Sequence, residues 1–165
     1  MSYASEEASM NMAEMPAMPG NTAPSAIGQA MPFRIARSGA RPLKFAGSEL
    51  AMAMSFTPEL PYWYEINLYR TNASQFVLAI RLFHQSEEKR DTVEAWQFKS
   101  LDEALAAIEH YDAAADVEAV LPDTTGQHCA AEIAAQAFEL RARIETQREH
   151  YRGLAGEILH ELDAG

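Results

Sequence analysis

Residues 62–69 and 76–83 form two runs in which every even-numbered position is apolar. Alternation with a period of two predicts β-strands, and two such runs around the short polar segment 72–74 predict a hairpin. A slip of one residue would turn every side chain to the opposite face, so the two apolar sets must share one face of the sheet. With 72–74 as the loop, Leu68 then pairs with Leu78.

The odd-numbered positions of the same hairpin combine aromatic and charged residues. In this register Trp63 faces Phe83, and Glu65 faces Arg81. Neither pair enters the choice of register, and each such cross-strand pair stabilises a sheet by roughly 0.2–1 kcal/mol. The odd face is therefore the leading candidate for a binding surface, which consists of Trp63, Glu65, Tyr69, Arg81 and Phe83.

The segment before the hairpin, residues 33–60, is the only basic stretch of the chain and begins as a solvated lead-in. From Leu50 to Phe56, large apolar residues alternate with Ala and Ser. This pattern predicts a strand whose second face is tightly covered, with Gly47 as a bulge.

After the hairpin, residues 92–99 predict a further strand of an antiparallel meander, with Trp96 and Phe98 facing inward. Glu94 would share their face, which requires either a late start of the strand or a bulge.

Two helical patterns complete the chain. Ser100 and Glu103 match a capping box, and the apolar stripe that follows predicts a helix lying on one sheet face. Between residues 129 and 163, one long helix or two in sequence carry an apolar seam that alternates in steps of three and four, the spacing of a surface facing another helix or a sheet. The main seam residues are Ile133, Leu140, Ile144, Tyr151, Leu154 and Ile158.

These elements define an α+β fold. We expect a three- to four-stranded antiparallel β-meander with one capped helix on a face, a long C-terminal amphipathic helix and a flexible N-terminal tail. Residues 1–32 are rich in Met, Ala and Pro, contain no Lys or Arg, and predict a disordered tail. The sheet and first helix occupy residues 33–120, and residues 121–165 form the C-terminal amphipathic helix, for packing or oligomerisation.

The net charge restricts the partners. The chain has 24 acidic and 13 basic side chains and a formal net charge of −11, which disfavours direct nucleic-acid binding because phosphate contact depends on Lys and Arg. The same charge favours basic protein surfaces, including those of a nucleic-acid-binding protein. No run approaches the roughly 18 apolar residues of a membrane span, the N-terminus lacks a secretory pattern and Cys129 is the only cysteine, so we expect a cytoplasmic protein without a membrane partner.

The sequence contains no constellation that assigns catalysis. Glu157 and His160 have the Glu-x-x-His spacing of di-iron bundles, but the second copy that such a site needs is missing. His128 beside Cys129 rarely places base and thiol on one substrate atom, so Cys129 is interpreted as structural. We therefore expect no catalytic residue, no metal and no cofactor.

The preferred function is that of a non-enzymatic, acidic binding or regulatory protein that acts by protein–protein contact. Its partner would bind the odd face of the hairpin, the helical seam, or both, and the C-terminal helix offers a surface for a homo-oligomer. The sequence gives equal weight to the alternative that this helix covers the odd face. Three alternatives remain: an acidic inhibitor in the nucleic-acid groove of another protein, a structural subunit of a larger assembly, and a small enzyme using Cys129 or a His–carboxylate pair.

Overall fold

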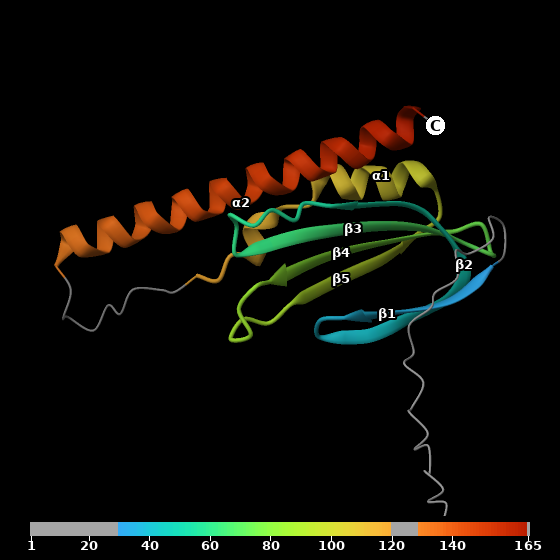
Figure 1. Cartoon of the computed structure of the whole chain (residues 1–165), viewed down its shortest axis with the longest axis horizontal. Helices are drawn as coiled ribbons and strands as arrows, with labels where there is room; N and C mark the ends of the chain where they lie inside the picture. Colours follow the sequence, from blue (N-terminus) through green and yellow to red (C-terminus); the bar gives the residue numbers. More distant parts are fainter. Residues whose placement is uncertain (1–29, 120–128, 165) are drawn as a thin grey trace, which may run out of the picture.

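The computed structural model describes residues 30–119 and 129–164, and it is an α+β fold built on one curled antiparallel sheet (Figure 1). The five strands follow one another in space as they do in the chain, so all neighbours are joined by simple reversals. The elements are β1 (Met31–Arg37), β2 (Ala40–Met54), β3 (Tyr62–Thr71), β4 (Phe76–His84), β5 (Thr92–Phe98), α1 (Leu101–His110), the short 3-10 helix η1 (Ala113–Asp116) and α2 (Ala130–Ala164).

The predicted class is confirmed, but the strand number of three to four is too low. The missing strand is β1, which includes the last two residues of the predicted tail and runs into the segment interpreted as a solvated lead-in. Its arginines and its proline hide the alternation of Phe33 and Ile35, which face the sheet interior. Residues 1–29 of the predicted tail, and residues 121–128 of the predicted C-terminal segment, lie outside the described residues.

The register of the β3–β4 hairpin is the predicted one throughout. Leu68 pairs with Leu78, Glu65 with Arg81 and Trp63 with Phe83. The even-numbered side chains of this hairpin enter the main core, where most of them are fully buried. Hydrophobic alternation was sufficient here because only one register buries both apolar sets on the same face.

Strand β5 pairs with β4 without a bulge, although Glu94 lies on the core-facing side. Neither the late start nor the bulge expected from the sequence occurs. Glu94 is exposed because β5 is the last strand of the sheet, whereas Trp96 and Phe98 on the same face pack against the main core as predicted.

Strand β2 changes face in its middle. The register with β3 shifts between Glu49 and Ala51, so the bulge lies at Leu50 and not at Gly47. One extra residue reverses the parity of a strand, and the large side chains before and after the bulge therefore lie on the same face. The small Ala51 and Ala53 then face the helices, which cover this face tightly as expected, whereas Met52 and Met54 on the other face are about half exposed. The large side chains in question are Leu43, Phe45, Met52 and Met54.

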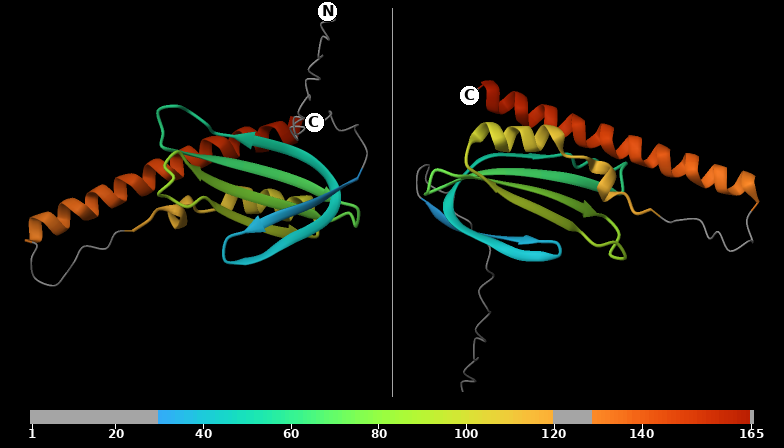
Figure 2. Two further views of the ribbon diagram at one scale, coloured as in Figure 1. Left: turned by 60° about the horizontal axis from the view of Figure 1, so that its bottom comes forward. Right: turned by 180° about the vertical axis from the view of Figure 1, so that it is seen from behind.

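Gly47 has a different role, which is to let β2 curl. A Cβ atom at this position would lie 2.1 Å from the carbonyl oxygen of Arg70 in β3. The first half of β2 and β1 fold under the sheet, and Ser38 in the β1–β2 turn reaches β5 at the other edge (Figure 2). There the amide of Ser38 donates to the carbonyl oxygen of Val93 at 2.8 Å, and the amide of Val93 donates to the Ser38 hydroxyl at 2.9 Å.

Both helices lie on the other, even-numbered face of the sheet (Figures 1 and 2). The predicted capping box starts α1, since the amide of Glu103 donates to the Ser100 hydroxyl and the Glu103 carboxylate accepts from the amide of Ser100. Helix α2 is continuous over 35 residues, about 50 Å at 1.5 Å per residue, and its N-terminal half projects past the strands. Within ranges 30–119 and 129–164, no helix is long and apolar enough to cross a membrane.

Candidate binding surface

The inner, odd-numbered face of the sheet is divided into a closed half and an open half. At the closed half, β1 and the start of β2 fold over β3, β4 and β5 and form a second core around Ile35, Val77 and Ala79. Tyr69 belongs to this core: it is 5% exposed, and its ring centroid lies 4.8 Å from that of Phe33. Tyr69 is therefore not available at the predicted surface, and the cover is the curled sheet itself and not the C-terminal helix.

At the open half, the other four predicted residues stay together and are joined by side chains from β2. The Trp63 ring stacks on Phe83 with centroids 5.3 Å apart, and Phe56 meets the Trp63 ring edge-on at the same distance. Met52 and Met54 extend this surface and are 51% and 52% exposed, while Phe56 is 52% exposed. We refer to Met52, Met54, Phe56, Trp63 and Phe83 as the apolar patch.

A row of charged and polar side chains separates the apolar patch from the second core. The Arg81 guanidinium donates to the Glu65 carboxylate and, at 2.6 Å, to the side-chain oxygen of Asn67. The amide nitrogen of Asn67 in turn donates to Glu49 at 2.9 Å. Because each member has a partner on the neighbouring strand, the row holds its charges at fixed positions beside the patch.

The predicted helical seam is used along only half of its length. Tyr151, Leu154 and Ile158 are buried in the main core, whereas Ile133, Leu140 and Ile144 in the projecting half are only partly buried. Gln147, which interrupts the apolar seam, is buried too. The sheet is shorter than α2, so only the C-terminal half of the seam packs on it.

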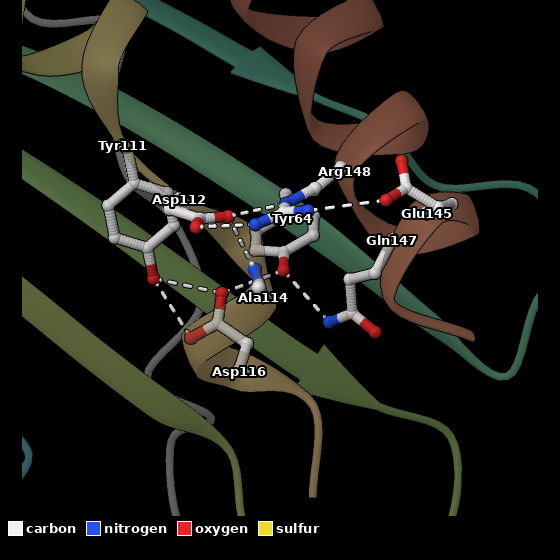
Figure 3. Close-up of polar contacts among 8 residues, drawn as sticks. All are labelled: Tyr64, Tyr111, Asp112, Ala114, Asp116, Glu145, Gln147 and Arg148. Carbon is white, nitrogen blue, oxygen red and sulfur yellow. Dashed lines mark hydrogen bonds and ion pairs between the residues drawn. The ribbon is translucent and has the colours of Figure 1, made fainter. Parts of the chain in front are cut away.

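Gln147 marks a polar cluster that fixes α2 to the sheet (Figure 3). Its side-chain amide donates to the Tyr64 hydroxyl at 2.8 Å, and that hydroxyl donates to Asp116 at 2.7 Å. The Tyr111 hydroxyl lies 2.9 Å from both oxygens of the same carboxylate. Sequence reasoning missed this cluster; its one signal is a polar residue at a seam position, because a buried amide needs a hydrogen-bonding partner.

The environment shifts the ionisation of this cluster. Burial raises the pKa of Asp116, although the hydrogen bonds from Tyr64 and Tyr111 act in the opposite direction. Burial, together with the nearby Asp116 carboxylate, also raises the pKa of both tyrosines. The neighbouring Asp112 behaves differently: hydrogen bonds from the Arg148 guanidinium hold the pKa of this exposed carboxyl well below its usual range, with nitrogen–oxygen distances of 2.8 Å.

A cleft of about 800 Å³ opens beside this cluster, between η1, the middle of α2 and the start of β3. Asp116 and His84 both line it, so this cleft is where the His–carboxylate pair of the enzyme alternative would lie. The buried Nδ1 of His84 has no hydrogen-bond partner in the described residues, and it lies 3.9 Å from the carboxylate of Asp91. Asp91 instead accepts from the backbone amide of His84, a turn contact. No hydrogen bond between described residues therefore orients the His84 ring as a general base in this cleft.

Cys129 stands exposed immediately before α2, where its amide donates to Glu132 at 3.0 Å. It does not line the cleft beside Asp116, and its predicted neighbour His128 lies outside the described residues. In the described ranges, no three His, Cys, Asp or Glu side chains are grouped closely enough to hold a metal ion.

Comparison with protein-family models, with curated proteins and with solved structures gives no match to this chain.

Proposed function

We propose that this protein is a non-enzymatic binding protein and that its partner protein docks on the apolar patch. One observation carries the proposal: Met52, Met54 and Phe56 are each about half exposed to solvent. They lie beside the stacked rings of Trp63 and Phe83. Contiguous apolar surface on a soluble protein commonly marks an interaction site. Aromatic residues, Met and Arg are also the residue types enriched in protein interfaces.

The composition of the patch supports a protein partner over a nucleic acid. Stacking of bases on aromatic side chains is normally accompanied by a basic groove. Here Arg81 is already paired with Glu65, and Glu49 lies in the same row of side chains. Methionine side chains adapt to differently shaped apolar partners, which suits a surface made for protein contact.

The test is retention of a partner by the full-length protein. Immobilised wild-type protein and the Trp63→Ala and Met52→Ser/Met54→Ser variants would be exposed to host extract, and the retained proteins identified by mass spectrometry. We expect a protein that wild type retains and both variants lose. The matched control is Phe138→Ser, since Phe138 is 73% exposed but lies on the projecting half of α2. Equal retention by wild type and the patch variants would contradict the proposal.

A second candidate is binding of a basic partner by the helical layer, as expected for an acidic inhibitor of a nucleic-acid-binding protein. Exposed carboxylates gather on α1 and the last turns of α2, where Arg152 is the one Lys or Arg from residue 149 to residue 164. This surface would make retention fall steeply with salt, because exposed charges are screened. Retention that is insensitive to salt would favour the apolar patch instead. The exposed carboxylates are those of Asp102, Glu103, Glu109, Glu149, Glu157, Glu161 and Asp163.

A further inference from the structure

The outer edge of β2 has no strand beside it after Gly47. Pairing with β1 begins at Met31 opposite Gly47, whereas β3 accompanies β2 as far as Met54. In the described part of the chain, the edge from Ser48 to Met54 therefore has a neighbouring strand on one side only. An open edge of this kind can accept an extended peptide as an additional strand.

The backbone direction at this edge follows from one hydrogen bond. The amide of Ser55 donates to the carbonyl oxygen of Tyr64 at 3.0 Å, so it points toward β3. Successive residues of a strand point their backbone groups to opposite sides. The N–H and C=O groups of Met54 and Met52 therefore point away from β3, toward the open edge, and are placed to pair with an added strand.

A groove of about 380 Å³ lies between the end of this edge and α2. Met54 and Phe56 line it from the sheet side, and Glu149, Gly153 and Glu157 line it from one row of the helix. A Cβ atom at Gly153 would meet nothing within 4 Å, so this side of the helix stays open. The described residues lining the groove include Glu149 and Glu157 and one histidine, His150, but no Lys or Arg.

We propose that the edge of β2 from Leu50 to Met54 binds an extended peptide in which apolar residues alternate with Lys or Arg. Side chains of a strand alternate between its two faces. The apolar set would lie on the inner face beside Met52 and Met54, and the basic set would face Glu149 and Glu157 on α2. The inference rests on the proposed function, because it adds the peptide's conformation and charge to contact with the same apolar patch.

A synthetic peptide tests this on the full-length protein. The probe is a fluorescein-labelled octapeptide of alternating Val and Lys, and its binding is followed by fluorescence anisotropy. Two further peptides serve as controls: one alternates Val and Glu, and the other carries N-methyl groups on alternate backbone amides. We expect only the unmodified Val–Lys peptide to bind, because methylated amides cannot pair with a strand edge.

Protein variants separate edge pairing from general attraction to an acidic protein. Glu149→Gln/Glu157→Gln removes the two charges of the groove, and Glu161→Gln/Asp163→Asn removes two exposed charges elsewhere on α2. Met54→Pro removes an N–H that points to the open edge and leaves the β2–β3 pairing intact. Loss of about 1 kcal/mol of hydrogen-bond or ion-pair energy corresponds to about fivefold weaker binding, which we expect for the groove variant and for Met54→Pro but not for the control variant.

Several outcomes would overturn the inference. These are no binding of the Val–Lys peptide, equal binding of its N-methylated form, and equal weakening by the groove and control variants.

A wild-type dimer that Met54→Pro converts to a monomer would assign the edge to a second copy of the chain. If Trp63→Ala abolishes retention of the natural partner while Met54→Pro and the groove variant do not, the edge inference fails and the proposed function stands. If the octapeptide binds as expected but no partner depends on Trp63, the proposed function fails alone.

Discussion

The side-chain amide of Gln147 donates a hydrogen bond of 2.8 Å to the hydroxyl of Tyr64, and this contact joins the middle of α2 to the middle of the sheet. The same hydroxyl donates to Asp116 in η1, so three elements far apart in the sequence meet at one oxygen atom. A buried polar network is stabilising only when all its members are paired. Changes to single members should therefore have measurable effects.

Replacing Tyr64 by Phe should destabilise the protein. The ring would be kept, but the Gln147 amide would lose its acceptor and Asp116 would lose a donor. An unsatisfied buried group costs about 1–3 kcal/mol, which urea unfolding would detect as a lower free energy of unfolding. Tyr62→Phe is the control, because the Tyr62 hydroxyl makes no hydrogen bond to any described residue. Equal losses in the two variants would mean that the network contributes nothing.

Asp116 should make stability fall as the pH rises through the weakly acidic range. Burial raises its pKa, so the folded protein keeps this proton to a higher pH than the unfolded chain does. Between the unfolded value, about 3.9, and the folded value, the folded state holds more protons, and the free energy of unfolding decreases with increasing pH. Above the folded pKa the loss is complete.

The measurement is urea unfolding of wild type and Asp116→Asn from acidic to neutral pH. The variant cannot titrate at this position, so the stability of wild type relative to the variant should decrease as the pH rises. Asp112 changes the free energy of unfolding in the opposite direction with pH. Because its pKa is lowered, it stabilises the folded protein above its unfolded pKa, and this stability is lost as the pH falls through its folded pKa. This second effect is present in both proteins and has the opposite direction to the one tested. Parallel stability curves would show that Asp116 is not perturbed.

Two glycines should respond in opposite directions to replacement by Ala. At Gly47 the new methyl group would lie 2.1 Å from the backbone oxygen of Arg70, so β2 and β3 would have to separate. Overpacking of this kind costs about 1–3 kcal/mol. At Gly156 the methyl group meets nothing within 4 Å, and the better helix propensity of Ala should stabilise α2 by up to about 1 kcal/mol. Thermal unfolding of both variants is the measurement: the unfolding temperature should fall for Gly47→Ala and rise for Gly156→Ala.

Deleting Leu50 should be far more damaging than changing it. Leu50 is the extra residue of the bulge, so its deletion would turn Met52 and Met54 toward the helices and Ala51 and Ala53 toward the inner face. The space beneath α2 accommodates only the small pair, and we expect a loss of cooperative unfolding in the deletion variant. Leu50→Ser leaves the length of the strand unchanged, and Leu50 is an exposed position. This variant should therefore unfold almost as wild type does. A cooperative, stable deletion variant would show that the register of β2 can slip.

The local pattern was a sufficient guide wherever one face of an element had to be buried. It predicted each pair in the hairpin from Trp63 to Phe83 and the cap at Ser100. It failed where a strand changes face or lies at an edge. Residues 50–56 alternate regularly between large and small side chains. The bulge at Leu50 decides that the small side chains, and not the large ones, face the core. Short, basic β1 showed too little alternation to be recognised.

The candidate surface was predictable in part. Trp63, Glu65, Arg81 and Phe83 share a face because strand periodicity requires it, whereas Met52, Met54 and Phe56 join them only because β2 is bulged and β2 and β3 lie side by side. Tyr69 was predicted at the same surface and is buried, since no local signal indicates that the sheet curls.

The sequence by itself therefore determined the register of the central hairpin, the start of α1, the length of the C-terminal apolar seam and the acidic charge. These properties depend on neighbours along the chain or directly across a strand pair. Only the tertiary structure decided which face the helices cover, how the inner face is divided and where α2 leaves the sheet. The face that β2 turns to the helices and the division of the inner face depend on the bulge at Leu50 and on the close approach of Gly47 to Arg70, where one residue changes the face or direction of a strand. Helix α2 leaves the sheet because it is longer than the strands.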